Sequence, residues 1–321
     1  MRIWRTGLTR LLQVFPVLLV VVVLNFTLIH LAPGDISGLL AGESADPAYL
    51  AGVRAQYGLD QPYIVQLWRY IATVASGDLG LSFRTHQPVL WEVLQRTPAT
   101  LLLVGTALTC SIVVGTTIGA WIARKPGGWL DQIISLVSIS LFSIPVFWLG
   151  LMLILIFAVW NRWLPTSGMQ TPGGPREGLA MVTDVLRHLV LPALTLAAAW
   201  VGQYVRLSRS AVQAVLAESY ITTVRAIGFP ERRVLLHYAL RNALLPVITV
   251  FGLQLGLVLA GATLTETLFS WPGLGRLIYD AILARDTPVI MGAFVMMSFS
   301  VALASFATDI AYAALDPRVR F

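Results

Sequence analysis

The sequence predicts an all-α polytopic membrane protein with six transmembrane helices. Of its 321 residues, 57% are hydrophobic and only 12% are charged, which exceeds what a soluble core of this size can bury. In addition, apolar runs long enough to cross a hydrocarbon core recur along the whole chain. The six runs cover residues 11–31, 100–123, 133–160, 188–205, 243–265 and 288–308.

The first run is uncharged and follows Arg2, Arg5 and Arg10. It is long enough to span a hydrocarbon core of roughly 30 Å. A cleaved signal peptide is the alternative, but the apolar region is too long for one, and Pro33 directly after Ala32 is a poor setting for cleavage. The run therefore predicts the first transmembrane helix.

A long extracytoplasmic loop is expected after this helix. It combines turn signals with short amphipathic pieces, which predicts a small folded cap and not a disordered linker. The turn signals are APGD at 32–35, YGLDQP at 57–62 and GDLGLS at 77–82, and residues 63–75 are one amphipathic piece. We thus divide the chain into an N-terminal helix and loop at 1–99, a transmembrane core of five helices at 100–315, and a cytoplasmic tail at 316–321.

The distribution of Lys and Arg predicts the orientation. With the N-terminus inside, thirteen of these residues fall on the inner side and five in the short outer segments. The remaining four lie in the loop at 32–99, which exceeds the roughly 60 residues to which the positive-inside rule applies. Both termini are therefore expected in the cytoplasm. Because the basic residues punctuate apolar segments instead of forming one stripe, we expect no nucleic-acid partner despite a pI near 9.8.

Small residues and prolines within the spans predict packing. Gly115 and Gly119 are four residues apart, as are Gly252 and Gly256, and this spacing lets helix backbones approach closely, within this chain or against a second one. Pro145 and Pro192 are expected to kink or start spans.

The one long charged passage between apolar runs, residues 218–246, predicts a helix-turn-helix elbow on the membrane surface. Residues 218–227 read as a short helix that ends at Gly228, which tolerates a left-handed cap, and at Phe229-Pro230. A second helix restarts at Glu231. The alternative is a basic loop that merely obeys the positive-inside rule.

Catalytic and metal-binding signatures are missing from the sequence. Lys125, the only lysine, lies between Arg124 and Pro126, so no phosphate-binding loop can form. The four histidines lack ligand spacing and there is one cysteine, Cys110. We therefore expect no metal site, no cofactor bound by this chain, and no enzymatic activity of its own.

The elbow resembles the EAA loop of ABC-transporter permeases, in the dipeptide, oligopeptide and nickel branch. The matching residues are Arg225, Ala226 and Gly228, then Arg232 and Arg233, then Arg241-Asn242-Ala243-Leu244 with Pro246. The acidic-Ala-Ala triplet that names the loop is Thr222-Thr223-Val224 here. The loop phrases at 32–82, the passage at 266–288, and the ending with Asp309, Tyr312 and Asp316-Pro317-Arg318 are also similar to this branch, so the resemblance covers nearly the whole chain.

The resemblance implies a type I ABC importer permease fold in a bacterial cytoplasmic (inner) membrane. The implied partners are membrane lipid, a homologous second permease, two cytoplasmic ABC ATPase subunits that carry ATP and Mg, and an extracytoplasmic solute-binding protein. Di- and oligopeptides are the implied cargo, with nickel or another small solute left open. The implied coupling loop is 206–242, with Glu218, Tyr220, Thr223, Arg225, Ala226, Gly228, Arg232, Arg233 and Arg241 as its contact residues.

Two further sets of residues are candidates. The turn with Trp271, Pro272, Gly273 and Gly275 precedes an amphipathic stretch at 274–284, which predicts an outer gate element partly tucked against the bundle. Polar side chains inside spans must face another helix or a water-filled cavity. The candidates for lining the translocation pathway are therefore Ser140, Ser143, Gln254 and Ser298. For Gln254 an interhelical hydrogen bond is the alternative.

Two other classes of function are weighed against the permease. An ion-coupled secondary transporter usually holds ionisable groups deep in the bilayer, but the acids nearest the spans, Glu266 and Asp309, lie at their ends. An intramembrane enzyme would need a paired acid or a Ser-His arrangement within the spans, and none is evident.

Overall fold

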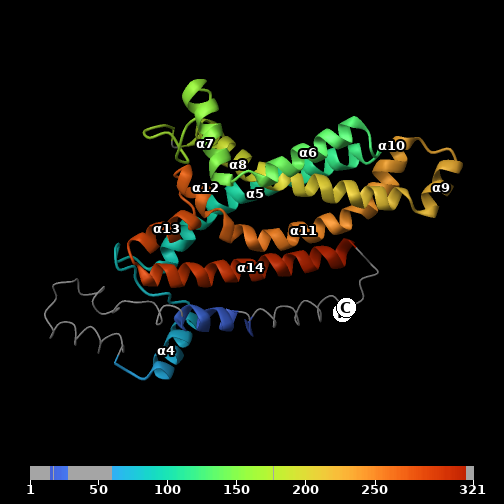
Figure 1. Ribbon diagram of the computed structural model, residues 1–321. Helices are drawn as coiled ribbons and strands as arrows, with labels where there is room; N and C mark the ends of the chain where they lie inside the picture. The colour runs from blue at the N-terminus through green and yellow to red at the C-terminus, as the bar shows by residue number, and fades with distance from the viewer. Residues whose placement is uncertain (1–14, 17, 28–59, 176, 316–321) are drawn as a thin grey trace. The chain divides into compact units, whose positions relative to one another are not determined.

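The computed structural model describes residues 15–16, 18–27, 60–175 and 177–315 (Figure 1). The APGD motif, residues 57–59, both ends of the first apolar run and the tail at 316–321 lie outside these residues. From residue 60 onward the elements are α4 (Tyr63–Ala75), α5 (Val89–Ile122), α6 (Trp129–Ser143), α7 (Val146–Leu153), the π-helix η1 (Ile154–Trp160), α8 (Gly178–Leu216), α9 (Ser219–Ala226), α10 (Glu231–Arg233), the π-helix η2 (Val234–Ala239), α11 (Leu240–Gly261), α12 (Thr263–Leu268), α13 (Leu274–Leu283) and α14 (Thr287–Leu315).

The long helices confirm the all-α membrane class. Within the described residues, four helical stretches are long and apolar enough to cross a membrane: Val89–Ile122, Gly178–Leu216, Glu231–Gly252 and Thr287–Phe306. Each of α5, α8, α11 and α14 begins before the apolar run that predicts it, because helical backbone hydrogen bonding does not require apolar side chains. A shorter apolar helix, Leu18–Thr27, falls within the first predicted run.

The third apolar run, counted as one span at 133–160, is broken into two helices. The helices at 129–143 and 146–160 are bent by 102° across a short break. Pro145 precedes α7, and Ile144 before it is extended with ψ of 128°, because proline disfavours the helical conformation of the preceding residue. The expectation that Pro145 starts a helix is confirmed.

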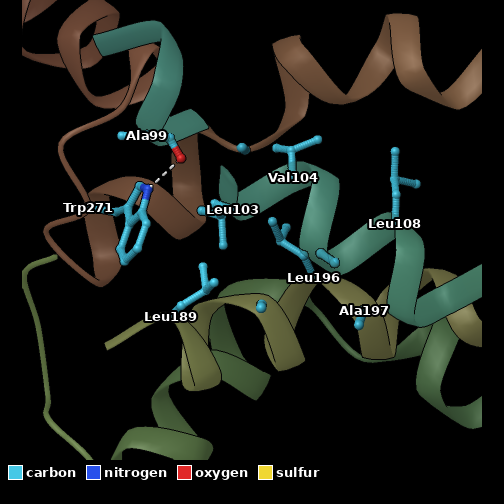
Figure 2. Close-up of a cluster of buried hydrophobic side chains, with 11 residues drawn as sticks. Ala99, Leu103, Val104, Leu108, Leu189, Leu196, Ala197 and Trp271 are labelled. Carbon is cyan, nitrogen blue, oxygen red and sulfur yellow. Dashed lines mark hydrogen bonds between the residues drawn. The ribbon is translucent and has the colours of Figure 1, made fainter. Parts of the chain in front are cut away.

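The chain separates into two compact units, Met1–Pro98 with Leu277–Leu303, and Ala99–Arg276 with Ala304–Phe321. The core of the second unit joins the middle of α5, residues 99–108, to α8 (Figure 2). Leu103 and Leu108 of α5 are fully buried there, next to Leu189 and Leu196 of α8. The Trp271 indole closes one end by donating to the Ala99 carbonyl at 2.8 Å.

Glycines set the spacing of helices in the second unit. A Cβ added to Gly115 or Gly119 would come within 3.0 Å of atoms of α8, and one added to Gly202 would collide with the Ser138 carbonyl of α6. The predicted close packing at Gly115 and Gly119 is thus confirmed, and it takes place within this chain. A Cβ on Gly252 would collide with the Thr308 side chain. The surroundings of Gly256 are outside what the structure describes.

The first unit folds its GDLGLS motif onto the start of α14. The buried Asp286 carboxylate accepts hydrogen bonds from the Ser82 hydroxyl at 2.5 Å, the Phe83 N–H at 3.1 Å and the Arg84 N–H at 3.2 Å. The Val89 N–H also donates to the Gly80 carbonyl at 3.0 Å. This part of the predicted cap is therefore folded.

Candidate functional site

The chain forms the predicted elbow directly after α8. The short helix α9 ends in a turn at Gly228, whose φ is +91°, the left-handed region that glycine adopts without steric cost. Pro230 then precedes the second helix, which begins at Glu231 and continues through η2 into α11. Figure 1 shows α9 and α10 together at one end of the helices that carry them. The glycine-proline stop pattern predicts this geometry correctly.

The elbow has a small hydrophobic core of its own. Ile221 and Val224 of α9 are buried against Val234 and Ala239 of the second helix. The Phe229 ring packs on Tyr238 with centroids 5.6 Å apart. Truncating a buried aliphatic residue to alanine costs about 2–5 kcal/mol, so this core is enough to hold the two helices as one body.

Hydrogen bonds from exposed side chains also connect the two helices of the elbow. The Arg225 guanidinium donates two hydrogen bonds to the Glu231 carboxylate, at 2.8 and 3.2 Å, and these raise the pKa of Arg225. Asn242 donates to the Tyr220 hydroxyl at 2.8 Å, and Tyr220 donates to the Tyr238 carbonyl at 3.2 Å. Because the Arg225–Glu231 pair is exposed, it contributes at most about 1 kcal/mol.

The predicted contact residues all lie on the exposed side of the elbow. They are Glu218, Tyr220, Thr223, Arg225, Ala226, Gly228, Arg232, Arg233 and Arg241. Ile227, near the turn of the elbow, is 68% exposed. The sequence does not single it out as a contact residue, because the nearby Ile221 and Val224 are equally apolar and are buried. The elbow thus presents an apolar tip within a basic rim, a combination found at protein interfaces.

An ion pair connects α8, nine residues before the elbow begins, to α6. Arg209 of α8 binds the Asp131 carboxylate through Nε and through Nη2, the second at 2.6 Å. Asp131 is 3% exposed and also accepts from the Gly127 N–H at 2.9 Å. The sequence assigns Arg209 only a topological role, because a residue 78 positions away supplies its partner.

The residues predicted as an outer gate gather around a buried carboxylate. Glu266 is fully buried and accepts hydrogen bonds from the Thr100 hydroxyl at 2.7 Å and the Arg276 N–H at 3.0 Å. A Cβ on Gly273 would collide with this carboxylate. Trp271 is fully buried, and a Cβ on Gly275 would lie 2.6 Å from Thr263.

Glu266 has no site role in the sequence-based prediction, which places it at the end of a span. The signal that could have identified it is a carboxylate followed, five to nine residues later, by Trp271, Pro272, Gly273 and Gly275, since such a compact turn needs an acceptor for its N–H groups.

Gln254 belongs to a polar chain between α8 and α11. The Tyr204 hydroxyl donates to Gln254 Oε1 at 2.5 Å, and Gln254 Nε2 donates to Gln203 Oε1 at 2.8 Å. Sequence reasoning singled out Gln254 but missed Gln203 and Tyr204, which stand beside the apolar face of α8. Ser140 and Ser143 lie in the last turn of α6, and the Ser143 and Ser298 hydroxyls each donate to a carbonyl of their own helix.

Long apolar helices lead into a self-packed, exposed elbow, which is the arrangement that the resemblance to ABC-transporter permeases implies. Residues 115–321 match the family described as the binding-protein-dependent transport system inner membrane component. Residues 3–104 match the N-terminal part of a membrane component of such systems. The chain therefore belongs to the family of binding-protein-dependent transport system inner membrane components, in which separate subunits hydrolyse ATP.

Curated relatives match over nearly the full length. The chain is 41% identical over 314 residues to the glutathione transport system permease protein GsiC of Salmonella paratyphi A, covering 98% of both chains. It is 39% identical over 312 residues to the protein of the same name from Escherichia coli strain K12, covering 97% of both.

Solved structures support the fold. The chain resembles an inward-facing structure of the MetNI methionine ABC transporter with a TM-score of 0.57 and 19% identity, covering 71% of this chain and 97% of the other. At this identity the likeness concerns the fold alone.

Proposed function

We propose that this chain pairs with a homologous second permease to form the path by which an ATP-driven importer takes up di- and oligopeptides, including glutathione-like peptides. The observation that carries the proposal is the full-length similarity to permeases named for glutathione transport. Glutathione is itself a tripeptide, so these relatives and the peptide-type motifs indicate the same chemical class of cargo. In this proposal both termini and the elbow face the cytoplasm.

The elbow is the part of the chain that would receive mechanical work. Two ATPase subunits, which would carry ATP and Mg, would dock on the exposed side of the elbow in this chain and in its sister permease. Closure of the ATPases would move both elbows together. Because each elbow is packed as one body, the movement would pass to α8 and α11 without being absorbed at the corner.

α8 is suited to carry this movement through the membrane. It runs unbroken from Gly178 to Leu216 and is held to α5 by close glycine contacts and to α6 by the Asp131–Arg209 ion pair. A movement of the elbow would thus move three helices together. The permease supplies a bundle with two states, and the ATPases supply the free energy that shifts the equilibrium between them.

The polar chain on α8 and α11 is our candidate for a cargo contact. A peptide backbone offers N–H donors and carbonyl acceptors, and the amide groups of Gln203 and Gln254 can pair with both. Both glutamines are half-buried, and each retains hydrogen-bonding capacity beyond the two bonds described. Ser140, Ser143 and Ser298 are weaker candidates, because a serine can satisfy itself on its own helix. The turn around Glu266 would form part of an outer gate.

Uptake into vesicles tests the proposed cargo. The chain would be reconstituted with the second permease, ATPases and binding protein of its transport system. The entry of labelled glutathione, a labelled dipeptide and radioactive nickel would be followed with ATP enclosed on the ATPase side. We expect ATP-dependent entry of at least one peptide. Entry of nickel alone, or peptide entry that follows an ion gradient and ignores ATP, would contradict the proposal.

A further inference from the structure

The amphipathic helix α4 has an exposed apolar stripe that the transport function does not explain. Ile64 and Trp68 are each 71% exposed. With the exposed Ala72 and Ala75 they recur at intervals of three to four residues, which places them on one side of the helix. A surface tryptophan beside a surface isoleucine is costly in water, at about 25 cal/mol per Å² of apolar area, so the stripe calls for an apolar neighbour.

The remaining two sides of α4 have different characters. One packs against the first helix: the Tyr63 and Tyr70 rings lie 5.4 and 5.5 Å from the Phe26 ring, and burial raises the pKa of Tyr70 to about 12. The other side is exposed and polar, with Arg69 and Thr73 one turn apart. The helix therefore has one side on protein, one apolar side and one polar side.

The contacts with the first helix place α4 at a definite depth. The Tyr63 and Thr27 hydroxyls are 2.6 Å apart, and Phe26 and Thr27 lie four to five residues before the end of the first apolar run at 11–31, within about 8 Å of it along a helix. Val20 and Leu24 of the described helix Leu18–Thr27 are more than half exposed, as lipid-facing residues of a span would be. The end of a membrane span lies at the boundary between hydrocarbon and headgroups, so α4 lies at that boundary too.

We propose that α4 is an interfacial helix that lies on the membrane with the stripe Ile64–Trp68–Ala72–Ala75 in the lipid and Arg69 and Thr73 toward the headgroups and water. Three features of the helix favour lipid over a protein partner. The helix packs directly on the first apolar helix, tryptophan concentrates at membrane interfaces, and the single charge of the helix, Arg69, lies off the stripe. This arrangement is that of an amphipathic helix whose apolar face enters the headgroup boundary by about 5–10 Å.

Site-directed spin labelling tests this placement without relying on transport. In a Cys110→Ala background, nitroxides would be attached at Ile64→Cys, Trp68→Cys and Ala72→Cys, with Arg69→Cys and Thr73→Cys as matched exposed controls on the same helix. The full chain, with the subunits that copurify with it, would be reconstituted in phosphatidylethanolamine and phosphatidylglycerol vesicles. Collision rates would be measured with oxygen, which concentrates in lipid, and with a water-soluble nickel chelate.

We expect the ratio of oxygen to nickel-chelate collisions to be several-fold higher at 64, 68 and 72 than at 69 and 73. Equal ratios along the helix, with free access of the nickel chelate, would show that the stripe faces water and would overturn the proposal. Exclusion of both reagents at the stripe would show that a protein segment covers it, whether from this chain or from a binding protein, and would overturn it equally. Ala72→Cys changes the side chain least, so it remains informative if Trp68→Cys fails to fold.

Discussion

Gly228 is the position at which the elbow can be perturbed without any steric collision. A Cβ added there would meet nothing within 4 Å, so the effect of a substitution comes from the φ of +91°. The left-handed conformation costs an L-residue about 1–2 kcal/mol, and a β-branched residue approaches 3 kcal/mol. A penalty of 1–2 kcal/mol changes the ratio of closed to opened corner by roughly 5- to 30-fold.

The series Gly228→Asn, Gly228→Ala and Gly228→Val should therefore lower coupling in that order, because asparagine tolerates the left-handed region best. The assay is uptake and ATP hydrolysis by the reconstituted complex, with and without loaded binding protein. We expect all three variants to insert normally, with Gly228→Val hydrolysing ATP without matching substrate delivery. Gly173→Val is the control, since Gly173 has a φ of +74° and equally open surroundings.

Two results would refute this reasoning. Normal transport and normal stimulated hydrolysis in Gly228→Val would show that the corner is not the coupling element. An equal loss in Gly173→Val would show that backbone strain acts through general stability and not through the elbow.

Three further predictions concern the rest of the chain. The purified chain alone should neither bind nor hydrolyse ATP, because it has no phosphate-binding loop; hydrolysis that survives removal of contaminating ATPases would overturn the functional account. In a Cys110→Ala background, Gln254→Cys should react with a small water-soluble thiol reagent at a rate that loaded binding protein and nucleotide change, whereas inertness in every nucleotide state would assign Gln254 to packing. Gly273→Ala should lower the melting temperature of the purified chain, since the added Cβ would collide with the Glu266 carboxylate. Gly105→Ala is the control and should leave the melting temperature unchanged, because a Cβ at position 105 would meet no atom within 4 Å. Equal melting temperatures of the two variants would mean that the turn at Gly273 relaxes freely.

The local features of the fold could be predicted because they follow from local rules. Apolar run length predicts the long helices, Gly228 and Pro230 predict the corner of the elbow, and the spacing of Gly115 and Gly119 predicts close helix packing. Each rule depends on residues within a few positions of one another. Pro145 likewise predicts a kink or a helix start where the chain bends by 102°, but not the size of the bend, because the surrounding helices decide whether a proline kinks a span or ends it.

The features that could not be predicted depend on partners far apart in the sequence. Thr100 and Glu266 are 166 positions apart, Ser82 and Asp286 are 204 apart, and Arg209 lies 78 from Asp131. Each involves a buried carboxylate whose cost of burial is offset by donors from another segment. In one sequence such a carboxylate looks like a surface acid at the end of a span, so its structural role emerges only from the fold.

Cross-linking from the tip of the elbow tests the central claim most directly. A photoactivatable thiol reagent would be attached to Ile227→Cys in a Cys110→Ala background, with Leu179→Cys as the control, since Leu179 is 84% exposed at the opposite end of α8. In the intact complex we predict a cross-link from position 227 to an ATPase subunit and none from position 179. Copurification of the ATPase without any cross-link from 227, or equal cross-linking from 179, would contradict the assignment of the elbow as the ATPase-coupling site.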